Sequence, residues 1–156
     1  MAIPEGYNTV SAYLIVSDAK EAMELYKQAF QAEGNACLTA PDGSVMHAEL
    51  RIGNSSVMLS EENEQWQMKS PLTLGGSPVT MHLYVDDADA WYKRATDAGM
   101  ETIQPPDDAF WGDRYCKVQD KFGHQWGIAT QVRQLTEEEL QFAANEWLQS
   151  MNPENA

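Results

Sequence analysis

The amino-acid sequence resembles itself when it is shifted by 69 residues. The shift places Val16-Ser17-Asp18-Ala19 on Val85-Asp86-Asp87-Ala88, and it pairs Leu14 with Leu83 and Leu59 with Ile128. A repeat of this length is too long for a solenoid unit. It predicts two small related modules packed as a pair, with any functional site between them.

Composition limits the partners that such a chain can have. A hydrophobic content of 43% in 156 residues fits one compact unit with a real core. The formal net charge of -14 repels phosphate backbones and anionic membrane surfaces. We therefore expect neither a nucleic acid nor a membrane as partner.

Location is predicted from what the sequence lacks. The first residues have no basic and apolar regions of a signal peptide, and no apolar run approaches the roughly 20 residues that span a bilayer. Cys37 and Cys116 are too few and too far apart for a disulfide framework or a zinc knuckle. We expect two free thiols in a cytoplasmic protein.

The first half has the signals of a βαβββ module, predicted over residues 7–62. Asp18 is a plausible N-cap with Glu21 three residues on, and the helix that it opens is expected to end at Gly34. Asp42-Gly43 is a hairpin signal. Strands are predicted at residues 10–16, 45–52 and 55–60.

The second half repeats this order over residues 78–132, after a linker at 63–77. Strands are predicted at 79–85, 114–119 and 125–130, with a helix opened by Asp86 or Asp87 and a loop through Pro105 and Pro106. The two modules together make one domain, residues 1–132. Thr136 and Glu139 form a capping box for a last helix in an extension, residues 133–156, which we expect to cover a sheet or a partner subunit.

Strand alternation divides the side chains between two faces of each sheet. One face is apolar and is expected to meet a helix: Val10, Ala12, Leu14, Val16, Met46, Ala48, Leu50, Ile52, Val57, Leu59, Val79, Met81, Leu83 and Val85. The other mixes aromatic, hydroxyl and ionisable groups: Ser11, Tyr13, Ile15, His47, Glu49, Arg51, Ser56, Met58, Ser60, Thr80, His82, Tyr84, Gln125, Gly127 and Ala129. Such a face suits a ligand site. A plain solvent-exposed sheet face is the alternative.

The sequence resembles the vicinal oxygen chelate superfamily, which includes glyoxalase I, bleomycin-resistance and fosfomycin-resistance proteins and extradiol dioxygenases. Three motifs resemble its PhnB-like, glyoxalase-like branch: His47-Ala48-Glu49-Leu50, Phe110-Trp111-Gly112-Asp113-Arg114 and Asp120-Lys121-Phe122-Gly123-His124-Gln125-Trp126. The resemblance covers Tyr7 to Val132. It implies an α+β fold in which the two modules form a curved mixed sheet around a cup. No glycine-rich cofactor loop supports methyl transfer.

The resemblance also implies a place for a divalent metal ion. In the enzymes of the superfamily His and Glu hold the ion, and those places fall here on Ser11, Met58, Thr80 and Gly127. None of these side chains is a good ligand for a divalent ion. We therefore expect no metal at the usual site and no other cofactor. A displaced site made by His47, Glu49 and His82 remains open.

Candidate site residues follow from the faces and motifs. His47 or His82 beside Glu49 has the chemistry of a general base, whereas the simpler reading is that Glu49 pairs with Arg51 or a histidine. Ligand-binding candidates are Tyr13, Met58, Tyr84, Trp111 and Arg114. The alternative for the last two is an Asp113–Arg114 ion pair with Trp111 in the core or a dimer interface. The shift aligns Cys116 with His47, which predicts that Cys116 faces the cup.

The leading functional hypothesis is a metal-free homodimer that binds a small organic molecule in the cup. The competing hypothesis is an enzyme, either a glyoxalase-type lyase or isomerase, a dioxygenase, or an acid–base catalyst that uses His47, Glu49 and His82. A third is an interaction module whose sheet face meets another protein. Whether the cup is closed within one chain or between two chains remains open at this point.

Overall fold

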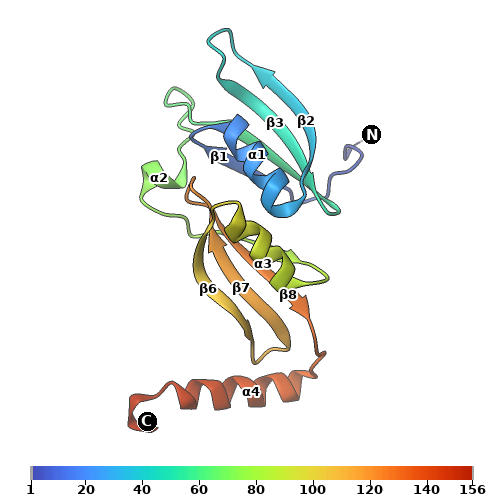
Figure 1. Cartoon of the computed structure of the whole chain (residues 1–156), viewed down its shortest axis with the longest axis vertical. Helices are drawn as coiled ribbons and strands as arrows, with labels where there is room; N and C mark the ends of the chain where they lie inside the picture. The colour runs from blue at the N-terminus through green and yellow to red at the C-terminus, as the bar shows by residue number, and fades with distance from the viewer. Residues whose placement is uncertain (1, 156) are drawn as a thin grey trace.

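The computed structural model describes residues 2–155, which form two modules side by side and a C-terminal helix (Figure 1). The first module consists of β1 (Ala12–Val16), α1 (Ala19–Phe30), β2 (Glu33–Thr39), β3 (Val45–Ile52) and β4 (Ser55–Glu61). The second consists of β5 (Thr80–Tyr84), α3 (Ala88–Asp97), β6 (Glu101–Asp108), β7 (Asp113–Gln119) and β8 (Gln125–Gln131). A short helix α2 (Pro71–Leu74) lies in the linker, and α4 (Glu137–Ser150) and a 3-10 turn (Pro153–Asn155) end the chain.

The two sheets have the same topology. Their strand orders are β1-β4-β3-β2 and β5-β8-β7-β6, with a parallel pair at β1–β4 and β5–β8 and antiparallel pairs elsewhere. The predicted α+β class and the repeated βαβββ module are therefore confirmed. The sheets are separate and do not close into a barrel. No helix of the described residues is long and apolar enough to span a membrane.

Local hydrogen bonds explain where the module helices begin. Asp18 and Asp87 are the N-caps, and their carboxylates accept hydrogen bonds from the backbone N–H groups of Glu21 at 2.9 Å and Ala90 at 3.0 Å. The choice left open between Asp86 and Asp87 is thus settled. The predicted end of the first helix at Gly34 is wrong, because Gln31 adopts the left-handed conformation at the C-cap, directly after Phe30.

The predicted loop through Pro105 and Pro106 is wrong, because these residues lie in β6. The strand is at the edge of its sheet, where a residue without an N–H group can be accommodated. Its pairing with β7 is irregular, with register shifts between Thr102 and Gln104 and between Gln104 and Asp107. Turn-forming residues therefore mark an irregular edge strand here.

The helix-facing core is largely as predicted. Leu14, Val16 and Leu59 are buried, as are Ala48 and Leu50 of β3. The exceptions are residues near strand ends. Val10 and Val79 precede β1 and β5 and are 87% and 54% exposed, and Met46 at the start of β3 is 45% exposed.

The two modules are joined through α1, α3 and the motif that begins at Asp120. Helices α1 and α3 pack against each other. The Tyr26 hydroxyl of α1 donates a hydrogen bond to the Asp120 carboxylate at 2.6 Å, and Trp126 Nε1 donates to the same oxygen at 2.9 Å. The Trp126 ring lies 5.1 Å from the Tyr26 ring and 4.8 Å from the Phe30 ring. This motif therefore fixes the modules as a pair.

The repeat changes its spacing by one residue within β7. Leu59 and Ile128 are 69 residues apart, but their antiparallel partners Ala48 and Cys116 are 68 apart. The connection between β7 and β8 is one residue longer than that between β3 and β4, which restores the spacing. Because one residue of register exchanges the two faces of a strand, Tyr115 and not Cys116 corresponds to His47.

The prediction that Cys116 faces the cup is therefore wrong. The residue is fully buried on the helix side, and its thiol lies 3.7 Å from the Ile128 carbonyl oxygen. Burial raises the pKa of the Cys116 thiol to about 11. Both Cys37, which is exposed, and Cys116 are free thiols.

Helix α4 begins at the predicted capping box. Glu139 N donates to Thr136 Oγ1 at 3.2 Å, and Thr136 N donates to Glu139 Oε2 at 2.9 Å. The helix extends from the end of the second module (Figure 1), and none of its residues is buried. The Trp147 ring lies 5.4 Å from the Phe110 ring, which holds one side of the helix against the module.

Candidate functional site

The open face of each sheet, which is the face opposite its helix, carries the polar and aromatic residues. On the first module three of them form a chain of hydrogen bonds. The Tyr13 hydroxyl lies 3.2 Å from His47 Nδ1, and His47 Nε2 lies 2.9 Å from Glu49 Oε1. Tyr13 comes from β1 and the other two from β3, and β4 lies between these strands. The sheet topology therefore brings residues together that are 34 positions apart.

Hydrogen bonding fixes the roles of the groups in this chain. The bond from His47 is the main cause that lowers the pKa of Glu49, followed by an interaction with the Tyr7 hydroxyl. Glu49 is therefore ionised at neutral pH and acts only as an acceptor, so His47 Nε2 must carry a proton. In the neutral imidazole, Nδ1 then accepts from Tyr13. The simpler reading of Glu49, a carboxylate paired with a histidine, is what the structure shows.

These residues face an open pocket of about 820 Å³. Its walls come from the open face and from the segment before β1: Ala2, Ile3, Pro4, Tyr7, Asn8, Thr9, Ser11, His47, Glu49 and Met58. The Tyr7 hydroxyl is shielded from solvent and has no well-aligned hydrogen-bond partner among residues 2–155. Burial, and secondly Glu49, raise the pKa of Tyr7. The pocket thus combines an apolar wall with a few polar groups, which is typical of ligand sites.

The open face of the second module is richer in aromatic rings. His82 lies 4.7 Å from the Tyr84 ring, and it stacks on Tyr115 at 5.9 Å with an angle of 15° between the planes. A side chain at Gly127 would come within 3.0 Å of His82 Nδ1 and 3.2 Å of the Tyr115 ring. The glycine therefore lets these two rings approach the sheet.

Trp111 and Asp113 are at one end of this face. Trp111 Nε1 donates to Asp113 Oδ2 at 2.9 Å, and the Trp111 ring lies 5.6 Å from Tyr115. The Tyr84 hydroxyl donates weakly to the same oxygen at 3.4 Å, and the Asp113 charge is the main cause that raises the pKa of Tyr84. Trp111 is thus part of the aromatic face.

Arg114 lies elsewhere. It makes a two-pronged ion pair with Asp89 of α3 at 3.0 and 3.1 Å, and Asp108 lies 3.5 Å away. The position is on the helix side of β7, opposite to Tyr115. The structure therefore gives Arg114 a link between helix and sheet, and the predicted Asp113–Arg114 ion pair is replaced by the pair with Asp89.

The predicted site residues thus fall into two groups. The first module brings together Tyr13, His47, Glu49 and Met58, and the second His82, Tyr84 and Trp111. Sequence reasoning missed Tyr7, Tyr115 and Lys117. The alternation of Tyr115 and Lys117 with the apolar Cys116 and Val118 was the signal for the last two, and the assumed spacing of 69 concealed it.

The residues present do not fit the divalent ion of related enzymes. Ser11 and Met58 line the first-module pocket, while Thr80 and Gly127 lie on the open face of the second module. Two hydroxyls, a thioether and a glycine are poor ligands for such an ion. Among residues 2–155 no group of three or more His, Cys, Asp or Glu is placed to hold a metal, so one chain does not assemble His47, Glu49 and His82 into a displaced site. A metal-free cup stays a prediction.

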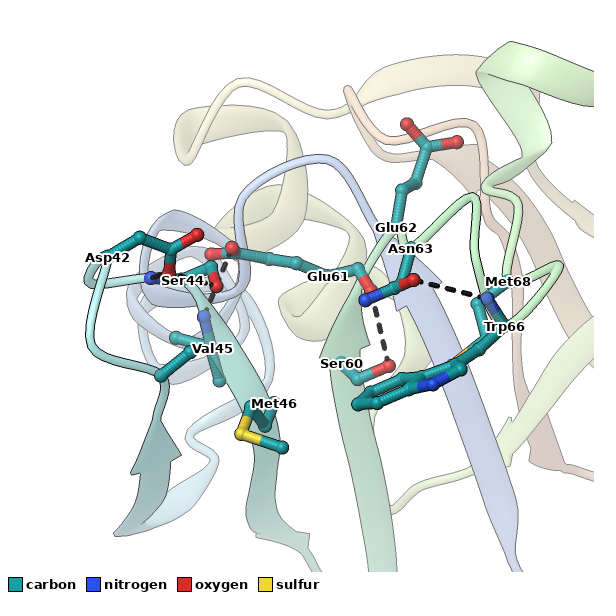
Figure 2. A pocket seen from close by; sticks show the side chains of 11 residues that line it. Asp42, Ser44, Val45, Met46, Ser60, Glu61, Glu62, Asn63, Trp66 and Met68 are labelled. Carbon is teal, nitrogen blue, oxygen red and sulfur yellow. Dashed lines mark hydrogen bonds between the residues drawn. The ribbon is translucent and has the colours of Figure 1, made fainter.

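A smaller pocket of about 160 Å³ lies at the end of β3 and β4, where Trp66 covers Ser60 (Figure 2). Its acidic groups are already bound within the chain. Glu61 accepts hydrogen bonds from the N–H groups of Ala19 and Val45 at 3.2 and 3.1 Å. A bond from Thr73 is the main cause that lowers the pKa of Glu62. These contacts give the pocket a structural role.

Comparison with known proteins agrees with this architecture. The sequence profile of the glyoxalase/bleomycin resistance protein/dioxygenase superfamily matches residues 7–128. An uncharacterized protein of Mycobacterium bovis is 41% identical over 137 residues, which cover 86% of this chain and 90% of that protein. The crystal structure of TioX from Micromonospora has a TM-score of 0.63 at 25% identity and covers 80% of this chain and 98% of its own.

A structure of a PhnB protein from Bacillus cereus shares the fold, with a TM-score of 0.60 at 15% identity over 79% of this chain and 99% of that one. The fold, the repeated module and the profile match all lead to the same assignment. The chain belongs to the glyoxalase/bleomycin resistance protein/dioxygenase superfamily.

Proposed function

We propose that the protein binds a small organic molecule between open faces of the two kinds of module, without the divalent ion used by enzymes of its superfamily. The observation that carries the proposal is the pocket of about 820 Å³ that Tyr13, His47 and Glu49 face. It has polar groups to orient a ligand and lacks a set of metal ligands among the described residues. Two free thiols are consistent with a reducing cytoplasm.

The cup of this proposal is completed by a second copy of the chain. Within one chain the modules meet through α1 and α3, so the open faces do not close over each other. His82 and Tyr84 of the second module are exposed, and Tyr84 is 69% exposed. A homodimer that places the first module of one chain over the second module of the other would cover both faces. Sedimentation equilibrium of the purified protein tests this, and a monomer at all concentrations would contradict it.

The absence of metal needs a direct test. Protein purified without chelator and without an affinity-metal column is analysed by elemental mass spectrometry. We expect less than about 0.1 equivalent of nickel, zinc, iron or manganese per chain. Binding is then tested by thermal shift against a broad panel of small organic molecules, because a ligand that binds only the folded state raises Tm. Near-stoichiometric metal would refute the metal-free proposal.

Acid–base catalysis is the second candidate function. Its support is the geometry of Tyr13, His47 and Glu49, in which a carboxylate orients an imidazole as it does in many general bases. Conversion of the methylglyoxal–glutathione adduct is one reaction to test, with and without added divalent ions. For a catalyst, His47→Ala and Glu49→Ala abolish turnover while substrate still binds, whereas for a binding protein they lower affinity only.

A further inference from the structure

Lys117 occupies the centre of the open face of the second module. It pairs with Gly127 of β8, and Gly127 pairs with His82 of β5, so the three residues form one row across three neighbouring strands. In the next row Tyr84, Ala129 and Tyr115 are paired in the same way. The lysine therefore stands beside two stacked rings, His82 and Tyr115.

Lys117 is half-buried and makes no hydrogen bond, ion pair or ring contact with another described residue. Other basic residues of the chain are paired, for example Lys27 with Glu24, Lys93 with Asp97, and Arg114 with Asp89. In a chain with 24 acidic and 10 basic residues, a free ammonium group on a ligand face is a specific feature. It provides a charge for which the chain itself supplies no counterpart.

The surroundings of Lys117 favour a planar partner for that charge. The rings of His82 and Tyr115 are nearly parallel at 15°, and Trp111 contacts Tyr115 from the other side. Gly127 adds no side chain between the lysine and His82. Flat faces offer stacking area to an aromatic ring, while an ammonium group pairs with a carboxylate.

We infer that the open face of the second module binds the carboxylate end of a planar aromatic acid, with Lys117 as the counter-ion and His82 and Tyr115 as the stacking surface. This inference rests on the proposed small-molecule function and names its ligand class. In the proposed dimer, ionised Glu49 of the opposite face repels the carboxylate and accepts a hydrogen bond from the other end of the ligand. The ligand is thereby held in one orientation.

The experiment uses two probes of the same shape, 2-naphthoate and the neutral 2-naphthamide. Binding to the full-length protein is measured by calorimetry and by the change in tryptophan fluorescence at low salt. We expect naphthoate to bind about ten-fold more tightly than naphthamide, and we expect this preference to fall as the salt concentration rises. In Lys117→Met the preference disappears because naphthoate weakens, while naphthamide binds as before.

Lys93→Met is the matched control, because it removes the same charge from the exposed surface of α3. It retains the preference for naphthoate. Thermal unfolding of each variant verifies that it is folded. Equal binding of the two probes to the unmodified protein would overturn the inference and leave the proposed function standing, and so would a preference that survives Lys117→Met. If neither probe binds but other molecules raise Tm, the ligand class is wrong. If no molecule of the panel binds, the proposed function fails as well.

Discussion

Glu49 and Lys117 stand at equivalent places on the open faces of the two modules and carry opposite charges. Glu49 pairs with Met58 and Lys117 with Gly127, and these partners are 69 residues apart in the repeat. Glu49 is hydrogen-bonded to His47, whereas Lys117 has no partner among the described residues. Duplication of one module has thus produced two faces of different polarity, which is how a cup made from both can distinguish the two ends of a ligand.

The buried carboxylate of Asp120 is expected to dominate the stability of the module pair. Its two oxygens accept four hydrogen bonds, from the side chains of Tyr26 and Trp126 and from the backbone N–H groups of Phe122 and His124. Asp120→Ala leaves at least two buried donors unsatisfied, so we expect a loss of about 3 kcal/mol or more in the free energy of unfolding.

Guanidinium unfolding measures this change for Asp120→Ala and for the control Asp86→Ala. Asp86 is exposed, and its substitution should alter the free energy of unfolding by less than about 0.5 kcal/mol. Similar losses for the two variants would show that the Asp120 contacts contribute little to the module pair.

The two thiols are expected to differ sharply in reactivity. Cys37 is exposed on β2, whereas Cys116 is fully buried and burial raises the pKa of its thiol to about 11. At pH 8 the folded protein should react with one equivalent of Ellman's reagent, and Cys37→Ser with none, because only the thiolate attacks. In denaturant the unmodified chain should react with two. Rapid reaction of Cys37→Ser in the folded state would place Cys116 at the surface.

The same pKa has a consequence for stability at high pH. Because folding favours the protonated Cys116 thiol, its contribution is fully present below pH 9 and declines as pH rises towards 11. Cys116→Ala should therefore have a shallower loss of Tm between these two values than the unmodified protein. Parallel curves would contradict the assignment to this thiol.

Glu49 should titrate below the usual range of a glutamate. His47 is the main cause of its lowered pKa and Tyr7 the second. Carbon NMR of the carboxyl group should show the pKa rising in His47→Ala and rising less in Tyr7→Phe. A lowered pKa stabilises the fold above the ordinary value and loses that effect as pH falls through the lowered one, so the stability difference between the unmodified protein and His47→Ala should shrink in acid.

Much of the fold could be predicted from the sequence because it depends on local signals. Asp18, Asp87 and Thr136 each cap a helix through a hydrogen bond to a backbone group three residues ahead, and such a bond needs no tertiary context. The internal repeat predicted the pairing of Leu14 with Leu59 and of Leu83 with Ile128, which the two parallel strand pairs share.

The rest depended on register and on sheet position. A change of one residue in the repeat exchanges the faces of β7, so Cys116 was assigned to the cup and Lys117 was overlooked. Pro105 and Pro106 indicate a loop in isolation, and only their place at a sheet edge permits a strand. The predicted cup residues Tyr13, His47 and Glu49 do converge, whereas whether they meet His82 depends on a second chain.

The C-terminal extension should be separable from the stability of the domain. Helix α4 has no buried residue, and its printed ring contact with the module is that of Trp147 with Phe110. A chain that ends at Arg133 should retain Tm within about 4 °C at low protein concentration, which corresponds to roughly 1 kcal/mol or less for a domain of this size. A loss of 10 °C or more would show that α4 belongs to the folding unit.

Gly112 provides a test of the turn that carries the FWGDR motif. Its φ of +101° is in the left-handed region, and an added Cβ would overlap the carbonyl oxygen of Arg133. The Gly112 carbonyl oxygen also accepts hydrogen bonds from Val132 and Arg133, so the turn and the end of β8 cannot move apart freely. We expect Gly112→Ala to cost about 3 kcal/mol or more, the sum of conformational strain and overlap. Gly43→Ala is the matched control, because Gly43 has a similar φ of +87° and open space around its Cβ position. It should cost only about 1 kcal/mol from conformation alone. Denaturant unfolding of both variants measures the difference, and equal costs would mean that the contact with Arg133 does not hold the turn in place.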